Sequence, residues 1–280
     1  MNKISTIMAT AAITFGVSSV TNALPHLQLD GEGGIYDTST ETTVCSTTSC
    51  DFYAIATPQG QITDALTLAD DYYISIAVIP KQTQTDPAPD YGSFTYSIDG
   101  GTAVTVNVTA DMSFGVPPLE AAMQLFDPGD LGDHGIFDTY FSEVAINFVA
   151  GKTITSYDVQ TDAGTPADEL GGIGSYYEKL TIDTTGLTGG IELHLDLYNE
   201  KILTGDVDIN KFAPFSHDAE TGSSSGGSTG GGGSTGGGGS TGGGGSTGGG
   251  AGVPEPSILA LVGFGMLSGL LFNRKRKIKV

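Results

Sequence analysis

Short runs in which apolar and polar residues alternate dominate the chain between Leu24 and Asp218, and they constrain its fold most. A period of two puts successive side chains on opposite faces of a strand, whereas an amphipathic helix needs a period of 3.6. The runs cover residues 51–57, 72–79, 94–98, 104–108, 144–148, 180–182 and 193–197. A span of roughly 195 residues is long enough for one sizeable core. The pattern therefore predicts an all-β domain over 24–218, an antiparallel β-sandwich of the jelly-roll kind with little helix.

Three local patterns refine this prediction. Residues 72–79 (YYISIAVI) are almost continuously apolar, which indicates a central strand covered on both faces. Asp99-Gly100-Gly101 separates two alternating runs with residues that tolerate positive φ, which predicts a β-hairpin. Residues 117–123 are the best helix candidate, because two prolines suit its start and Glu120 suits the positive end of its dipole.

Glycine and serine dominate residues 219–252, where a six-residue repeat begins at Ser228 and recurs at Ser234, Ser240 and Ser246. Such a segment buries no apolar surface and has maximal backbone entropy, so we expect a flexible, disordered linker. A flexible segment of about 32 residues spans roughly 30 Å on average. The linker would hold a folded domain away from its attachment point.

The N-terminus has the composition of a secretory signal peptide. Lys3 precedes a stretch of apolar and small residues from Ile4 to Val20, and small residues at Thr21 and Ala23 suit signal peptidase. We therefore expect residues 1–23 to be a signal peptide cleaved after Ala23. The alternative is an uncleaved membrane anchor.

Residues 253–280 form the second targeting segment, in which an apolar run, Ile258–Phe272, precedes a basic cluster. The basic residues are Arg274, Lys275, Arg276, Lys277 and Lys279, so the basic tail spans 274–279. As a helix the apolar run is about 22 Å long, short of the ~30 Å hydrocarbon core of a bilayer. Basic residues favour the cytoplasmic side, so everything before Val253 is expected on the opposite, outer side of the membrane. An ordinary single-pass helix remains an alternative, but the pattern favours a processed anchor.

Pro254, Glu255 and Pro256, followed by this short hydrophobic helix and the basic cluster, resemble the PEP-CTERM sorting signal. The resemblance implies export by a Gram-negative bacterium and handling by signal peptidase and exosortase. It also implies transient contact with the inner membrane through 258–272. The resemblance covers a tenth of the chain and concerns sorting, not activity.

The charge of the exported part excludes some partners. Between Leu24 and Gly252, thirty-one acidic residues face five lysines and no arginine, a balance of −26. Phosphate binding depends on lysine and arginine, so nucleic acid and anionic lipid are poor partners. A surface this acidic favours solubility or the binding of divalent cations.

Cys45 and Cys50 are the only cysteines. Two cysteines in an exported protein usually pair, and two ligands are too few for a zinc site. We therefore expect a disulfide at the end of a hairpin, worth about 2–3 kcal/mol because the loop is short. Free thiols are the alternative.

Two acidic segments are calcium candidates. Asp127, Asp130 and Asp133 lie in a Gly-rich loop, where their oxygens could converge on calcium. Asp206 and Asp208 begin a D-x-D-x-N sequence, but lysine replaces the glycine that an EF-hand loop needs. A solvated turn is the alternative for both segments.

No catalytic motif stands out in the sequence. His194, Asp196 and Tyr198 share one face of a strand that we expect to be solvated, although a sugar or a metal could bind there. Acid pairs for glycoside hydrolysis are too numerous to choose among. They include Glu120, Glu143, Asp168, Glu169, Glu178 and Glu192. We therefore predict no catalytic residues and no enzyme activity.

Four segments of the domain resemble the choice-of-anchor N family of exported proteins. They are residues 24–30, 117–120, 134–141 and 212–218. The resemblance implies a domain that works outside the cell whatever its anchor, and it supplies no catalytic residue. Three functions follow as hypotheses. The first is a surface-attached domain that interacts with extracellular polysaccharide or matrix, as in a biofilm. The second is a calcium-dependent binding module, and the third, less favoured, is a polysaccharide hydrolase.

Overall fold

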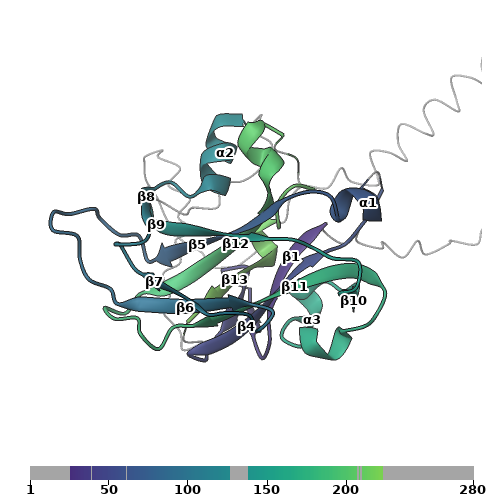
Figure 1. Cartoon of the computed structure of the whole chain (residues 1–280), viewed down its shortest axis with the longest axis horizontal. Coiled ribbons are helices and arrows are strands. Elements are labelled where there is room, and N and C mark those ends of the chain that lie inside the picture. Colours follow the sequence, from purple (N-terminus) through teal and green to yellow (C-terminus); the bar gives the residue numbers. More distant parts are fainter. Residues whose placement is uncertain are drawn as a thin grey trace, which may run out of the picture. The chain divides into compact units, whose positions relative to one another are not determined.

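The structure is a computed structural model, and it describes residues 26–38, 40–60, 62–126, 138–206, 208 and 210–222. Two β-sheets pack face to face in this part of the chain (Figure 1). The all-β sandwich predicted from the alternating runs is confirmed.

The first sheet, sheet A, has the strand order β1-β4-β11-β6-β7, and β10 pairs with β11 outside this path. Its strands are β1 (Leu27–Gly31), β4 (Ser49–Ala56), β11 (Gly174–Asp183), β6 (Ser93–Ile98), β7 (Val104–Asn107) and β10 (Thr153–Thr155). The predicted hairpin joins β6 to β7. Asp99 and Gly100 adopt φ values of 51° and 68° there, as the turn requires.

The second sheet, sheet B, has the order β2-β3-β13-β12-β5-β9-β8. Its strands are β2 (Ile35–Asp37), β3 (Thr42–Cys45), β13 (Asp218–Thr221), β12 (Glu192–Asn199), β5 (Tyr72–Ile79), β9 (Thr139–Ile146) and β8 (Ser113–Gly115). As predicted, β5 is central, between β12 and β9. Among the described strands, β13 and β3 form the one parallel pair.

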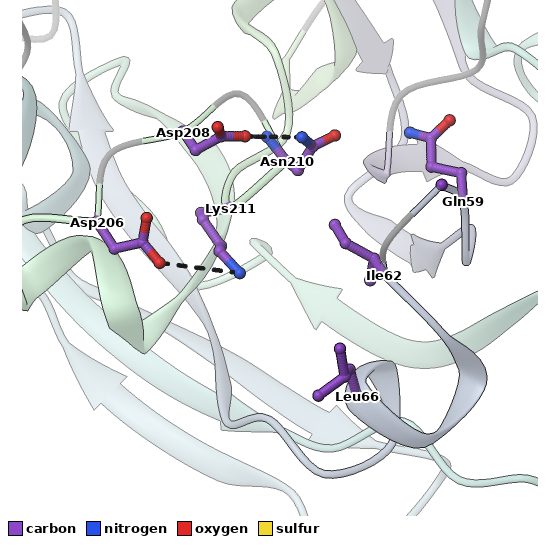
Figure 2. Close-up of a pocket in the computed structure, with 8 residues that line it drawn as sticks. Gln59, Ile62, Leu66, Asp206, Asp208, Asn210 and Lys211 are labelled. Atoms are coloured by element: carbon purple, nitrogen blue, oxygen red, sulfur yellow. Dashed lines mark hydrogen bonds and ion pairs between the residues drawn. The ribbon is translucent and has the colours of Figure 1, made fainter.

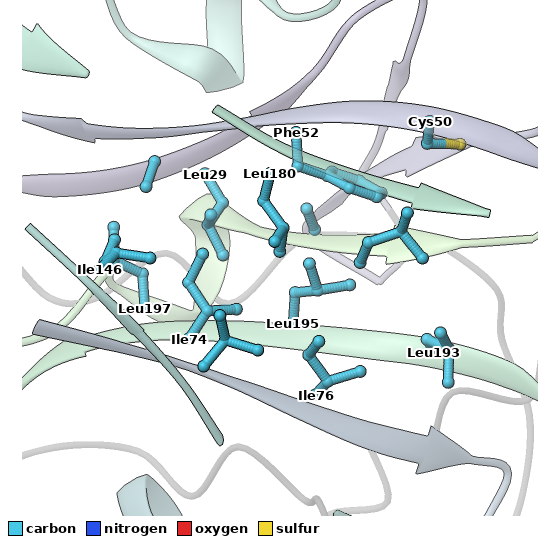
Figure 3. Close-up of a cluster of buried hydrophobic side chains, with 14 of the residues drawn as sticks. Leu29, Cys50, Phe52, Ile74, Ile76, Ile146, Leu180, Leu193, Leu195 and Leu197 are labelled. Atoms are coloured by element: carbon cyan, nitrogen blue, oxygen red, sulfur yellow. The ribbon is translucent and has the colours of Figure 1, made fainter. Parts of the chain in front are cut away.

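The core lies between the two sheets. Leu193, Leu195 and Leu197 of β12 are fully buried and point to sheet A, as the alternation predicts. The core residues labelled in Figure 3 are Leu29, Cys50, Phe52, Ile74, Ile76, Ile146, Leu180, Leu193, Leu195 and Leu197.

Short helices cover parts of the outer faces. The α-helices are α1 (Asp64–Thr67), α2 (Pro118–Phe126) and α3 (Val159–Asp162), and the 3-10 helices are η1 (Pro166–Glu169), η2 (Glu200–Thr204) and η3 (Phe215–His217). Helix α2 lies where the sequence predicts helix, and its Leu119 and Met123 pack against Tyr198 and Phe212 on the outer face of sheet B. No helix of the described residues is long and apolar enough to cross a membrane.

The disulfide between Cys45 and Cys50 is present, with a Cα–Cα distance of 6.3 Å. The pairing was predicted correctly, but the hairpin was not. Cys45 ends β3 in sheet B, whereas Cys50 lies in β4 of sheet A, so the bond links the two sheets. The chain crosses between sheets here because β4 pairs with β1 and β11 rather than with β3.

The last strand extends past the predicted end of the domain at Asp218. Residues of β13 are buried through Thr221, because Ala219 packs in the core while the strand pairs with β3 and β12. Three residues assigned to the linker from sequence therefore belong to the sandwich.

Candidate functional site

An open depression of about 600 Å³ lies between the residues around α1 and the turn that follows η2 (Figure 2). Its lining residues are Gln59, Gly60, Ile62, Leu66, Asp206, Asp208, Asn210 and Lys211. The lining combines carboxylate, amide and ammonium groups with two aliphatic side chains. Such a surface offers hydrogen bonds to a polar ligand and a small apolar contact area.

Both aspartates predicted from the D-x-D-x-N sequence line this depression. Asp208 Oδ1 accepts hydrogen bonds from the backbone N–H and the Nδ2 of Asn210, at 2.9 and 2.7 Å. Lys211 Nζ lies 4.0 Å from Asp206 Oδ2 (Figure 2). These contacts are those of a turn with a nearby cation, and calcium binding here stays a prediction.

The other predicted site residues lie outside the described residues. They are Asp127, Asp130 and Asp133 of the acidic loop, Pro254, Glu255 and Pro256 of the sorting motif, and Arg274, Lys275, Arg276 and Lys277 of the basic cluster.

A second polar cluster is buried on the outer face of sheet B. We expected the face of β12 that carries His194 and Asp196 to be solvated, and this expectation was wrong. His194 is 1% exposed, Asp196 and Asp218 are 0% exposed, and Glu220 is 5% exposed. The histidine ring lies between two of these carboxylates. Its Nδ1 is 2.9 Å from Glu220 Oε1, and its Nε2 is 3.1 Å from Asp196 Oδ1.

Two adjacent strands and one helix build this cluster. His194 of β12 lies directly opposite Glu220 of β13, and the continued register places Asp196 opposite Asp218. Each pair of residues two apart shares a face of its strand. Glu120 of α2, 3% exposed, adds a carboxyl group near Asp218.

The electrostatics of the cluster follow from its burial. Burial, together with the charge of Asp196, raises the pKa of Asp218 well above its usual value, although His194 opposes the shift. Burial lowers the pKa of His194, but the carboxylates of Asp196 and Glu220 outweigh burial and raise it well above its usual value. The buried carboxyl groups of this cluster are therefore stabilised by protonation or by nearby positive charge.

A third buried polar group lies on the outer face of sheet A. Asp30 of β1, 0% exposed, accepts hydrogen bonds from the backbone N–H of Gly164 and the hydroxyl of Tyr157. Burial raises the pKa of Asp30 to about 6, against the lowering effect of these bonds. The segment that carries α3 is thereby fixed to β1. Gln28 adds to this attachment by accepting from the backbone N–H of Val159.

Comparisons with known proteins bear on sorting. The family of the PEP-CTERM protein-sorting motif matches residues 252–277. No curated protein matches the chain. Among solved structures, a collagen-binding domain from a Staphylococcus aureus adhesin is similar at 9% identity, covering 64% of this chain and 86% of that domain. The TM-score of 0.17 is too low for this likeness to support an argument. The sorting motif indicates an exported protein that is sorted by exosortase.

Proposed function

We propose that this protein is a non-catalytic β domain displayed at the surface of a Gram-negative bacterium, where it interacts with extracellular polysaccharide or matrix. Signal peptidase removes residues 1–23 during export. The helix at 258–272 holds the chain in the inner membrane until exosortase processes the tail. The sandwich then stands off its attachment point on the Gly/Ser-rich segment.

The PEP-CTERM match at residues 252–277 is the single observation that carries this proposal. The acidic balance of the exported part and its disulfide suit a protein that works outside the cytoplasm. The resemblance of 24–218 to the choice-of-anchor N family supports the same location.

The depression in Figure 2 is the surface that we propose for the polysaccharide contact. Asp206, Asp208 and Asn210 present carboxylate and amide groups, which bond the hydroxyls of a sugar. Ile62 and Leu66 supply an apolar contact for the C–H face of a sugar ring.

Calcium-dependent binding is the alternative, because the carboxylates of Asp206 and Asp208 line the same depression. Glycan arrays of wild type and of the Asp206→Asn/Asp208→Asn variant, run in calcium and in chelator, distinguish direct sugar binding from calcium-dependent binding. Calcium dependence that this variant abolishes favours the alternative, whereas binding that is equal in chelator favours the simple sugar contact. Asp162→Asn/Asp168→Asn is the matched control, since both aspartates are exposed and lie on a different segment.

The sorting proposal is tested in the host with Glu255→Gln/Pro256→Ala. This variant leaves the apolar run Ile258–Phe272 intact, so insertion into the membrane should not change. We expect full-length, unprocessed protein to accumulate in the inner membrane. Ser268→Ala, a change within the apolar run, is the control and should be sorted normally. Normal sorting of the first variant would contradict recognition of the motif.

The basic cluster gives a second test. Replacing Arg274, Lys275, Arg276 and Lys277 with glutamine removes the charge that favours the cytoplasmic side. Processing should fall because the helix is no longer held in position. Unchanged processing in this variant would show that the basic residues are not needed.

A further inference from the structure

The buried cluster on sheet B has the spacing of a metal centre. One ligand atom from each of His194, Asp196 and Asp218 can be chosen so that all three lie within 4.8 Å of one another. The Nε2 of His194 is 3.1 Å from Asp196 Oδ1. Two ligands that are each about 2.0–2.2 Å from an ion, at angles near 90–110°, lie about 3–3.5 Å apart. The histidine and the first aspartate therefore already have the separation of neighbouring ligands.

The second nitrogen of the histidine has the partner that a metal ligand needs. Nδ1 lies 2.9 Å from Glu220 Oε1, which fits donation of the Nδ1 proton to that carboxylate. Without an ion, Nε2–H would donate to Asp196 Oδ1; a metal ion would replace that proton and take the lone pair of Nε2. A carboxylate that orients a ligating imidazole in this way is typical of metal centres in proteins.

Ser75 provides an independent observation. It lies on β5 directly opposite Asp196, so its side chain is on the face of the cluster. Its hydroxyl is fully buried and has no hydrogen-bond partner within the described part of the chain. A buried hydroxyl without a partner is costly. A bound ion, or a water held by the ion, would satisfy it.

A bound cation would stabilise this cluster because its carboxyl groups are buried. Asp196, Asp218, Glu220 and Glu120 are carried into the protein interior on three different elements, with one imidazole among them. Carboxylates are buried at high cost unless they are paired, protonated or bound to a metal. One divalent ion would offset two of these charges at once.

We propose that His194, Asp196 and Asp218 bind a divalent transition-metal ion, with Glu220 orienting the histidine and Ser75 facing the ion. One imidazole with several carboxylates suits Zn²⁺ or Mn²⁺, whereas calcium sites use oxygen ligands. The site is closed to solvent, so the ion is structural. It joins β12 to β13, the last strand before the Gly/Ser-rich segment, and so reinforces the sandwich where the predicted tether begins.

The proposal is tested by metal titration of the protein recovered from its host, after treatment with a chelator. We expect one Zn²⁺ or Mn²⁺ per chain and a Tm that rises by several degrees as the ion concentration exceeds Kd. His194→Gln and Asp218→Asn should each weaken binding at least a hundredfold. Glu220→Gln should weaken it about ten- to hundredfold, as expected for a group that orients a ligand.

The matched controls are His26→Gln and Asp30→Asn. Each replaces a buried side chain of the same kind near or on β1, in the other sheet, and each should leave metal affinity unchanged. A wild-type Tm that does not respond to millimolar Zn²⁺ or Mn²⁺ would overturn the proposal. So would affinity that is equally retained in His194→Gln and Asp218→Asn, or a response to Ca²⁺ alone.

X-ray absorption of the zinc-loaded wild type identifies the ligands without any variant, so it tests the proposal even if the variants fail to fold. We expect one imidazole and two or three oxygens at about 2.0–2.2 Å. A shell with several imidazoles, or with none, would contradict the assignment. These measurements use the purified protein, so their failure leaves the sorting proposal, which is tested by location in the host, untouched.

Discussion

Asp30→Asn is expected to change how the stability of the sandwich depends on pH. The carboxyl group of Asp30 is buried, and its pKa is raised from its ordinary 3.8 to about 6. The folded protein therefore binds this proton more tightly than the unfolded chain does. Its contribution to stability is full at low pH and is lost as pH rises through about 4–6.

The size of the effect follows from the shift. Each pKa unit corresponds to about 1.36 kcal/mol, so at pH 7 burial of the ionised group costs roughly 3 kcal/mol. Asparagine carries no charge at any pH and keeps an oxygen that can accept from Gly164 N–H. Its amide group alters the contact with the hydroxyl of Tyr157, at a cost of about 1 kcal/mol.

The assay is urea denaturation of wild type and variants between about pH 2.5 and pH 7.5. The free energy of unfolding of Asp30→Asn, relative to wild type, should increase by about 3 kcal/mol from the low to the high end of this range. Asp51→Asn is the control, and its stability relative to wild type should change with pH in the opposite direction. Burial raises the pKa of Asp51, but hydrogen bonds from Thr181 and Lys179 outweigh burial and lower it. That variant should lose stability at neutral pH and approach wild type as pH falls below 4. A relative stability of Asp30→Asn that does not vary with pH would refute the reasoning.

Three further predictions concern stability and are read from Tm and from chemical denaturation. Cys45→Ser/Cys50→Ser should lose about 2–3 kcal/mol because the unfolded chain gains entropy, and an unchanged Tm would show that the bond adds nothing. Gly164→Ala should destabilise by more than 1 kcal/mol, because φ is +91° and a Cβ would lie 2.2 Å from the backbone oxygen of Gly34. Normal stability of that variant would contradict the geometry at this position. Leu195→Ala should cost 2–5 kcal/mol, roughly the range for a buried leucine, and a loss below 1 kcal/mol would place Leu195 outside the core.

The strands could be predicted from the sequence because the alternation of apolar and polar residues shows directly which residues share a face. The sequence predicted β5 as a central strand, the turn at Asp99-Gly100, and the partner of Cys45. It could not show that β3 and β4 belong to different sheets, because pairing between strands distant in sequence leaves no local pattern. The inter-sheet position of the disulfide was therefore missed.

The buried cluster escaped prediction for a related reason. Alternation in β12 placed His194 and Asp196 on the face opposite the leucines, and a polar face is usually solvated. Carboxyl groups of β13 and of α2 lie beside this buried face, and the sequence of β13 is itself polar, with only Ala219 facing the core. The one local signal was the shared i, i+2 spacing of His194 and Asp196 with Asp218 and Glu220.

The mass of the mature protein from its native host tests the central proposal most directly. If the chain is exported and sorted through its PEP-CTERM segment, intact-mass and terminal-peptide measurements should find an N-terminus at Leu24. They should also find that the hydrophobic and basic residues of 258–280 have been lost. A C-terminus at Val280 would contradict processing and would leave the tail as an ordinary membrane anchor.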